Sequence, residues 1–261
     1  MGILNITPDS FADGGLYLDP GAAEAAAVEM EVRGADLVDV GGESTRPGSD
    51  TIRPEAEIAR IQPVLSRLAR SLKIPISIDT SKPAVAQVAI GEGAALINDV
   101  TGLRYDASLA EIAARSGAGL ILMHARGRSR DMYKDAHYAS VRVEIADELR
   151  ASLERALSSG VCLESVVLDP GLGFAKRPDQ SYAALAALPT FAALGCPLLV
   201  GPSRKSFLSA AIGERAPGER DMATAASVAA AVLLGAHIVR VHNVPAMVDA
   251  VRVADAIRQQ C

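Results

Sequence analysis

The chain of 261 residues is 49% hydrophobic and carries a formal net charge of −5, so it can bury a large core and offers no basic run for nucleic acid. No apolar run approaches the ~18–20 residues that span a bilayer, so no membrane partner is expected. The first residues lack the basic and apolar segments of a signal peptide, and the three cysteines are far apart. These features favour a cytoplasmic protein with free thiols.

Short β-rich runs alternate with longer, Ala-rich helical patterns along the chain. Strands are predicted at residues 2–6, 37–41, 76–79, 96–99, 120–124, 166–169, 198–201 and 238–242. Helices are predicted at residues 20–33, 54–72, 83–92, 107–116, 140–159, 179–194, 221–234 and 245–259, and residues 125–140 read as a loop. Eight strands, each followed by a helix, imply parallel strands with right-handed crossovers. We therefore expect an α/β protein with one domain over residues 1–261, a closed (β/α)8 TIM barrel, and a doubly wound open sheet is the alternative.

A polar residue stands at or just after the end of every predicted strand. In barrels of this kind the chemistry lies at the C-terminal ends of the strands, so these side chains are expected on one rim. Each residue alone can be explained without a ligand, as a helix cap or part of a turn, but a polar residue at all eight strand ends is hard to obtain by chance. The rim residues are Asn5, Thr7, Asp39, Glu43, Asp79, Asn98, Asp99, His124, Asp169, Ser203, Lys205, Arg240 and His242.

The charges near this rim indicate the kind of ligand. Several groups are cationic or can become so, which suits a phosphorylated substrate. Carboxylates and amides suit a flat heterocycle with several N–H groups, because unpaired buried donors are costly. The cationic groups are Arg46, Lys205, Arg240 and His242. The carboxylates are Asp79 and Asp169, and the amides are Asn5 and Asn98. The sequence therefore predicts a nitrogen-rich heterocycle that carries phosphate.

Two segments near the rim have no helical or strand periodicity, and a third follows a predicted strand. Residues 7–15 and 41–49 are mixed polar and Gly-rich, and they read as loops that could close over a ligand. Residues 198–208, LLVGPSRKSFL, end an apolar run with Gly-Pro and a basic cluster. That cluster could be a phosphate loop, a Ser-Lys nucleophile pair or a helix start, but the P-loop spacing G-x-x-x-x-G-K-[ST] is absent.

Eight motifs follow one another in order, one at nearly every predicted strand end. They are GILNITPDSFADGG (2–15), DVGGESTRPG (39–48), ISIDTSKP (76–83), INDVTG (97–102), LMH (122–124), LDPGLGF (168–174), GPSRKSFL (201–208) and GAHIVRVHNV (235–244). Together they resemble the dihydropteroate synthase family of pterin-binding enzymes. The resemblance implies a (β/α)8 barrel that joins 6-hydroxymethyl-7,8-dihydropterin diphosphate to 4-aminobenzoate and releases diphosphate. It also implies a homodimer and a site at which sulfonamides compete.

The resemblance assigns roles to particular residues of these motifs. It implies a deep pterin pocket lined by Asp79, Asn98, Asp169 and Lys205, with Met123 and Arg240 against the ring. It implies that the diphosphate is held by Asn5, Arg46, Arg240 and His242, with Mg²⁺ near Asn5. It implies an aminobenzoate pocket formed by Phe11, Asp13, Thr45, Pro47, Phe174, Ser203 and Lys205, with Ser203 starting a helix that attracts the carboxylate.

The implied mechanism is departure of diphosphate before attack by the amine. Arg46, Arg240, His242 and Mg²⁺ would stabilise the leaving group, and Asp13, Asp79 and Asp169 the cation. The aniline amine is neutral at pH 7, so no strong general base is needed. The alternatives are a methyltetrahydrofolate methyltransferase and a non-catalytic pterin-binding paralogue.

This chain departs from the family pattern in a few places. It has Ala175-Lys176 where the family often has Gly-Lys, and Asn243 where HDV is common. It also has His124-Ala125-Arg126-Gly127 in place of HMQG-like residues. None of these changes removes a proposed ligand-contacting residue.

Overall fold

The strands form the closed barrel that was predicted. The computed structural model describes residues 1–7, 17, 19–44, 48–127 and 132–260. Six parallel strands pair in sequence order, and two more form a second parallel pair. The strands are β1 (Gly2–Asn5), β2 (Val38–Gly41), β3 (Ile76–Asp79), β4 (Leu96–Asp99), β5 (Gly119–Met123), β6 (Val166–Asp169), β7 (Leu199–Val200) and β8 (Ile238–Val239).

Two single bridges join the strand groups into a ring. Leu168 pairs in parallel with Leu198, which connects β6 to the β7 side, and Gly2 pairs with Val241, which connects β8 to β1. Backbone bonds from Ile3 N to Val241 O and from Val241 N to Met1 O, both 3.0 Å, support the second junction. The alternative of an open, doubly wound sheet is therefore wrong. The last two strands are shorter than predicted, because only these bridges continue their pairing.

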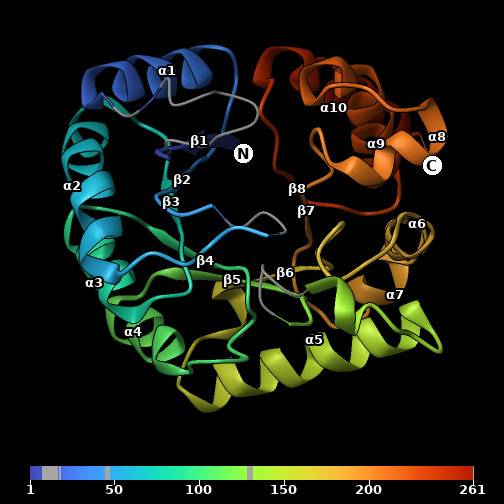
Figure 1. Ribbon diagram of the computed structural model, residues 1–261, viewed down its shortest axis with the longest axis horizontal. Coiled ribbons are helices and arrows are strands. Elements are labelled where there is room, and N and C mark those ends of the chain that lie inside the picture. Colours follow the sequence, from blue (N-terminus) through green and yellow to red (C-terminus); the bar gives the residue numbers. More distant parts are fainter. Residues whose placement is uncertain (8–16, 18, 45–47, 128–131, 261) are drawn as a thin grey trace.

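The helices surround the strands (Figure 1). They are α1 (Pro20–Val32), α2 (Pro54–Ser71), α3 (Pro83–Gly91), α4 (Ser108–Ser116), α5 (Val141–Ser158), α6 (Pro178–Ala186), α7 (Leu188–Ala192), α8 (Ser209–Ile212), α9 (Asp221–Leu233) and α10 (Val244–Arg258). Local signals explain the first boundary, since Asp19 Oδ1 accepts from Ala22 N at 2.8 Å and Pro20 lies in the first turn. Gly34 follows this helix with a φ of 97°.

Two sequence predictions need correction. The helix predicted at residues 179–194 is two helices, α6 and α7, separated at Ala187. Pro189 lies in the first turn of α7, where it lacks an N–H to continue α6, so a break before it is expected. The loop predicted at 125–140 contains a short 3-10 helix, η1 (Met132–Asp135).

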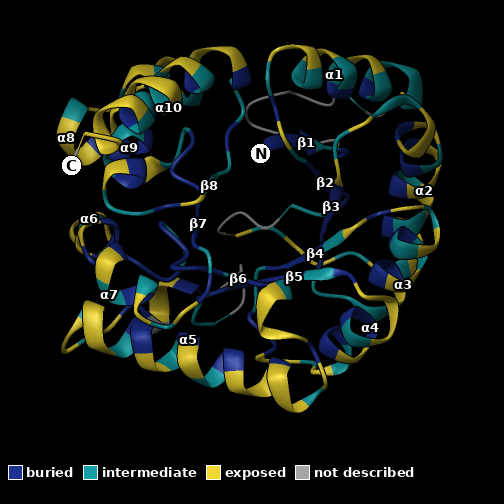
Figure 2. Ribbon diagram, turned by 180° about the vertical axis from the view of Figure 1, so that it is seen from behind, coloured by how far each residue is buried: buried dark blue, intermediate teal, exposed yellow. Residues whose placement is uncertain are grey.

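The core lies between the strands and the inner faces of the helices. Every residue of β2 and β3 is buried, as expected for parallel strands covered on both faces. In Figure 2 the helices show buried residues toward the strands and exposed residues outward. No helix in the described part of the chain has the length and hydropathy needed to cross a membrane.

Candidate active site

Neighbouring strands carry polar side chains at one level of the barrel. The register aligns Asn5 with Gly41, Gly41 with Asp79, and Asp79 with Asn98. Gly41 has no side chain, and a Cβ placed there would lie 3.7 Å from Asn5 Oδ1 and 3.8 Å from Asp79 Oδ2. The structure therefore brings Asn5, Asp79 and Asn98 together on one rim.

Arg240 lies at the centre of the buried charges. It extends from the segment after β8, and its Nε donates to Asp39 Oδ2 at 2.6 Å while its Nη2 donates to Asp79 Oδ2 at 2.9 Å. Asn98 Nδ2 donates to the same Asp39 oxygen at 3.0 Å. Sequence reasoning placed Asp39 on the rim but gave it no role, whereas the structure makes it the common anchor of Arg240 and Asn98. A carboxylate inside a fully buried strand was the signal for such a partner.

The two carboxylates of this cluster keep acceptors free. Asp39 Oδ1 and Asp79 Oδ1 are buried and have no hydrogen-bond partner among the described residues. Burial raises the pKa of Asp79, while the Arg240 guanidinium opposes that rise. Unpaired acceptors in a buried site are costly until a donor meets them. The cluster is therefore suited to a ligand that brings N–H groups.

Asp169 and Lys205 face each other beside this cluster. Asp169 Oδ1 accepts from Gly171 N at 2.7 Å, and burial raises the pKa of Asp169 against the opposing charge of Lys205. Lys205 Nζ donates to Leu172 O at 2.5 Å and lies 4.5 Å from the centre of the Phe174 ring. Burial lowers the pKa of Lys205 to about 8, so the ammonium form still prevails at pH 7.

Met123 borders the same region from β5. Its side chain is buried, and its register partner is Asp169. A Cβ on Gly171 would lie 3.2 Å from Met123 Cγ. Met123 is thus packed between β6 and the segment that follows Asp169.

The prediction that Ser203 starts a helix is wrong. The next helical residues are Ser206–Leu208, a 3-10 turn that is followed by the four residues of α8. Arg204 has a φ of 57°, a left-handed conformation that interrupts a helix. The Ser203 hydroxyl instead lies 2.9 Å from His242 Nδ1 and accepts from His242 N at 3.1 Å. Ser203 and His242 are therefore a pair that joins the ends of β7 and β8.

Some predicted site residues lie outside the described residues. They are Phe11, Asp13, Thr45, Arg46 and Pro47. The described part of the site consists of the strand ends and the segments after β6, β7 and β8.

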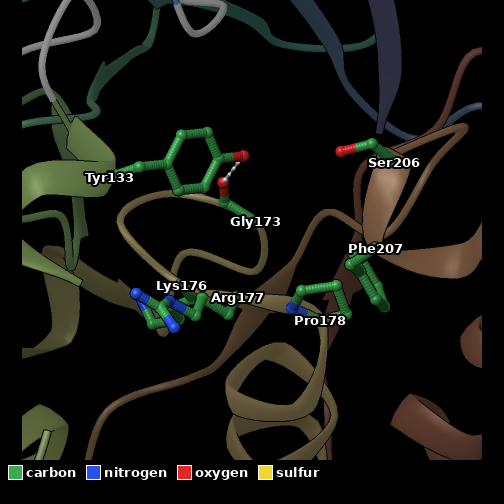
Figure 3. A pocket seen from close by; sticks show the side chains of 7 residues that line it. All are labelled: Tyr133, Gly173, Lys176, Arg177, Pro178, Ser206 and Phe207. Carbon is green, nitrogen blue, oxygen red and sulfur yellow. Dashed lines mark hydrogen bonds between the residues drawn. The ribbon is translucent and has the colours of Figure 1, made fainter. Parts of the chain in front are cut away.

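A pocket of about 310 Å³ lies beside the segment after β6 (Figure 3). Its lining includes Tyr133, Gly173 and Arg177, together with Ser206 and Phe207 from the segment after β7. It is not the carboxylate cluster itself. Ser206 was not selected from the sequence, although its place directly after Lys205 put it in the same basic motif.

Comparison with known proteins agrees with this geometry. The description "pterin binding enzyme" belongs to the family model that matches residues 1–242. The dihydropteroate synthase of Mycobacterium leprae is 44% identical over 262 residues, which cover 98% of this chain and 92% of that protein. The Yersinia pestis dihydropteroate synthase, solved in a sulfonamide drug complex, superposes with a TM-score of 0.95 at 37% identity and covers 99% of this chain and 94% of its own.

The Xanthomonas albilineans dihydropteroate synthase, solved with 4-aminobenzoic acid, gives a TM-score of 0.91 at 38% identity. The match covers 99% of this chain and 92% of that chain. The chain belongs to the pterin binding enzyme family. The prediction of a dihydropteroate synthase, a transferase of folate biosynthesis, is confirmed by these relatives.

Proposed function

We propose that the chain condenses 6-hydroxymethyl-7,8-dihydropterin diphosphate with 4-aminobenzoate, giving 7,8-dihydropteroate and diphosphate. The observation that carries this proposal is the buried cluster of Asp39, Asp79, Asn98 and Arg240, with unpaired carboxylate oxygens beside Asp169 and Lys205. A flat pterin with several N–H groups satisfies those oxygens. Diphosphate release that requires both substrates is the expected result in a turnover assay. Release without aminobenzoate at the same rate, or no release, would contradict the proposal.

The side chains proposed to bind the pterin are already fixed in position by other contacts. Asp79 and Asp169 accept from pterin N–H groups, Asn98 supplies an amide, and the Lys205 ammonium donates to the pterin carbonyl. Met123 packs against the ring. The contacts of Asp79 with Arg240 and of Asp169 with Gly171 N fix both carboxylates before the ligand arrives, which reduces the cost of ordering them.

The chemical step breaks the bond between the pterin methylene carbon and the diphosphate oxygen, and the oxygen keeps the electron pair. Arg240, His242 and Arg46 stabilise the departing charge. The carboxylates of Asp79, Asp169 and Asp13 stabilise the cation left on the pterin. The aniline nitrogen then forms the new C–N bond and loses its proton to solvent. Because both reactants are held in line, no strong base is needed.

Mg²⁺ is part of this proposal. The Asn5 amide oxygen lies at the rim beside Asp79, as the positions around Gly41 indicate, and Mg²⁺ binds hard oxygen ligands of this kind together with substrate phosphates. Among the described residues no group of three His, Cys, Asp or Glu side chains could hold a metal ion. This donor set fits an ion that arrives with the diphosphate, and the ion would supply charge neutralisation of the leaving group.

The aminobenzoate lies over the pterin in the same proposal. Phe174 and Lys205, in contact with each other, form one wall, and Ser203 lies nearby on the segment after β7. Phe11, Thr45 and Pro47, which lie outside the described residues, are the other proposed contacts of the aminobenzoate. Sulfonamides compete at this position, a proposal that the drug complex of the Yersinia pestis relative supports.

Binding of 4-aminobenzoate is expected to depend on the first ligand. Arg46 binds the diphosphate, and its sequence neighbours Thr45 and Pro47 contact the aminobenzoate, so both ligands share one segment and each is expected to favour binding of the other. Calorimetric titration should show at least about tenfold tighter aminobenzoate binding, roughly 1.4 kcal/mol of coupling, when Mg²⁺ and diphosphate are present. Diphosphate should tighten equally when aminobenzoate is added, because the coupling is reciprocal. Equal aminobenzoate affinity with and without diphosphate would contradict the shared-segment explanation.

The homodimer is also a proposal. Large apolar side chains are exposed on two helices that pack on each other, Met222 and Leu233 on α9, and Val253 and Ile257 on α10. Apolar surface of this kind supports a second copy as partner. The cytoplasmic location stays a prediction.

A further inference from the structure

The segment after β6, residues 171–175, is held by side chains at every carbonyl. These residues form neither helix nor strand, yet each backbone oxygen accepts a hydrogen bond from a side-chain donor. The donors are Lys176 for Gly171 and Phe174 (both 3.0 Å), Lys205 for Leu172 (2.5 Å), the Tyr133 hydroxyl for Gly173 (3.4 Å) and the Tyr138 hydroxyl for Ala175 (3.1 Å). We call this stretch the 171–175 segment.

The backbone conformation explains why the segment needs these donors. Gly171, Gly173 and Ala175 have positive φ values of 66°, 78° and 48°, so the sign of φ alternates along the segment and no regular hydrogen-bond ladder can form. Buried carbonyls without a ladder must find other partners. A Cβ on Gly171 would lie 2.0 Å from His124 O, which shows how closely the segment packs against the end of β5.

Lys176 makes two of these five contacts, more than any other donor. Its side chain is 1% exposed, and its Nζ lies 2.8 Å from His124 Nδ1 and 3.3 Å from His124 O, in addition to its bonds to Gly171 O and Phe174 O. Burial strongly lowers the pKa of Lys176, while the Asp169 carboxylate opposes this. Three carbonyl oxygens and a ring nitrogen around one Nζ form the environment of an ammonium donor. A lysine is buried here because it satisfies the backbone of a segment that carries Phe174.

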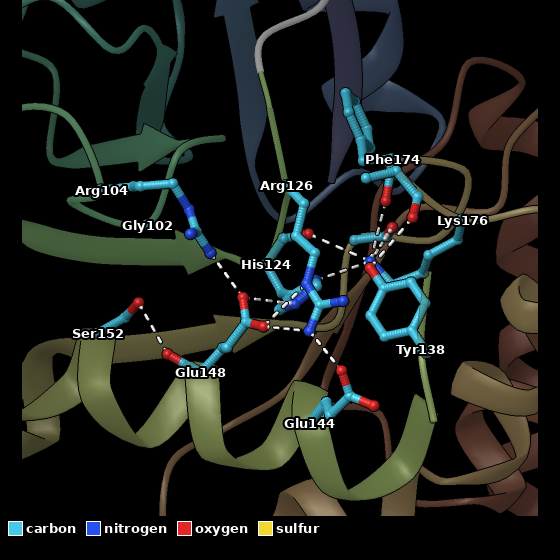
Figure 4. Close-up of polar contacts among 12 residues, drawn as sticks. Gly102, Arg104, His124, Arg126, Tyr138, Glu144, Glu148, Ser152, Phe174 and Lys176 are labelled. Atoms are coloured by element: carbon cyan, nitrogen blue, oxygen red, sulfur yellow. Dashed lines mark hydrogen bonds and ion pairs between the residues drawn. The ribbon is translucent and has the colours of Figure 1, made fainter. Parts of the chain in front are cut away.

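The outer helix α5 supports Lys176 through His124 (Figure 4). His124 Nε2 lies 3.2 Å from Glu148 Oε2 without the geometry of a hydrogen bond, so the carboxylate favours the Nε2–H tautomer through its charge, and Nδ1 is left as an acceptor for Lys176. Glu148 is in turn held by Arg104 at 2.6 Å and by Arg126 Nε at 2.9 Å. These contacts fix the ring orientation of His124 and thereby the place of the Lys176 Nζ.

A second path returns from Glu148 to the 171–175 segment. The Arg126 guanidinium lies 4.0 Å from the centre of the Tyr138 ring, and the Tyr138 hydroxyl donates to Ala175 O. Gly171 and Ala175, the two ends of the segment, are therefore both linked to Glu148 on α5. Its opposite side carries Phe174 and the Leu172 carbonyl, both of which contact Lys205.

We infer that Lys176, oriented by His124 and Glu148, is a positioning residue that sets Phe174 and Lys205 for the aminobenzoate. The inference rests on the proposed function. In this inference Lys176, His124 and Glu148 contribute to the affinity for aminobenzoate. Lys176 has no side-chain contact with Asp79 or Arg240, but it binds the backbone of the segment whose Leu172 carbonyl accepts from Lys205.

Lys176→Met removes the donors while nearly keeping the side-chain volume. We expect the KM for 4-aminobenzoate to rise at least about tenfold and the Kd of pterin diphosphate to rise less, because Phe174 and Lys205 both serve the aminobenzoate whereas the pterin keeps Asp79 and Asn98. Hydrogen exchange of peptides covering residues 171–175, measured without any substrate, should accelerate at least about tenfold. A variant that loses thermal stability but keeps the wild-type KM and exchange rates in this segment would overturn the inference.

Glu148→Gln provides a milder test on the partly exposed helix α5 and serves if Lys176→Met does not fold. It weakens the support of His124, and we expect a rise in the KM for 4-aminobenzoate of about threefold. Asp147→Asn is the matched control on the same helix, since Asp147 is exposed and pairs with Arg150 rather than with His124 or Arg126, and its KM should stay at the wild-type value. Equal KM changes in the two variants would overturn the inference. An inactive wild-type protein would contradict the proposed function. The hydrogen-exchange rates of residues 171–175 would still decide whether Lys176 positions this segment.

Discussion

Replacement of Arg240 by Met should lower the free energy of unfolding by about 3–5 kcal/mol at pH 7. The reason is that Asp39 and Asp79 would lose their shared cation while both carboxylates stay buried. Urea unfolding of the wild type and the variant measures the difference. Arg67→Met is the matched control, since the Arg67 side chain is 49% exposed where it pairs with Glu24, and we expect it to lose less than about 1 kcal/mol.

The loss in Arg240→Met should depend on pH in a defined direction. Burial already raises the pKa of Asp79, and removal of the opposing guanidinium raises it further. A carboxyl whose folded pKa is raised destabilises the protein as pH rises above its unfolded value of about 3.9. The deficit should therefore be smaller at pH 5 than at pH 7. A loss below about 1 kcal/mol at pH 7, or a deficit that grows toward pH 5, would contradict the buried charge cluster.

Lys205→Met should reduce kcat/KM at least about 100-fold, or about 2.7 kcal/mol. The variant removes a buried ammonium that faces Asp169 and donates to Leu172 O, and a hydrogen bond to a charged group contributes about 1.5–3 kcal/mol. Steady-state kinetics with both substrates measures the change. In the wild type, activity that needs this ammonium should fall as pH rises through the pKa of about 8.

Lys205→Arg separates charge from shape. The guanidinium keeps the charge, but it is larger and planar, and the Lys205 chain passes Gly173 so closely that a Cβ there would lie 3.3 Å from Lys205 Cδ. We expect at least about a tenfold loss of kcat/KM, roughly 1.4 kcal/mol. Wild-type activity of Lys205→Arg would show that Lys205 only supports the 171–175 segment.

The order and type of the elements could be predicted from the sequence because local patterns decide them. Continuous apolar runs mark strands that are buried on both faces, and caps such as Asp19-Pro20 mark helix starts. Errors arose where one residue changes the local backbone. Pro189 divides the predicted helix at 179–194, and the left-handed Arg204 delays the helical turn after Ser203.

The sequence by itself determined which residues stand at the strand ends and that their charges suit a phosphorylated, nitrogen-rich ligand. Only the tertiary structure decided the partners among them. Arg240 pairs with Asp39 and Asp79 across 201 and 161 residues of chain, and Lys176 pairs with His124 across 52. No local periodicity records such pairs. They form because closure of the barrel removes water from the charged side chains, and each buried donor or acceptor must then find its partner from another strand or segment.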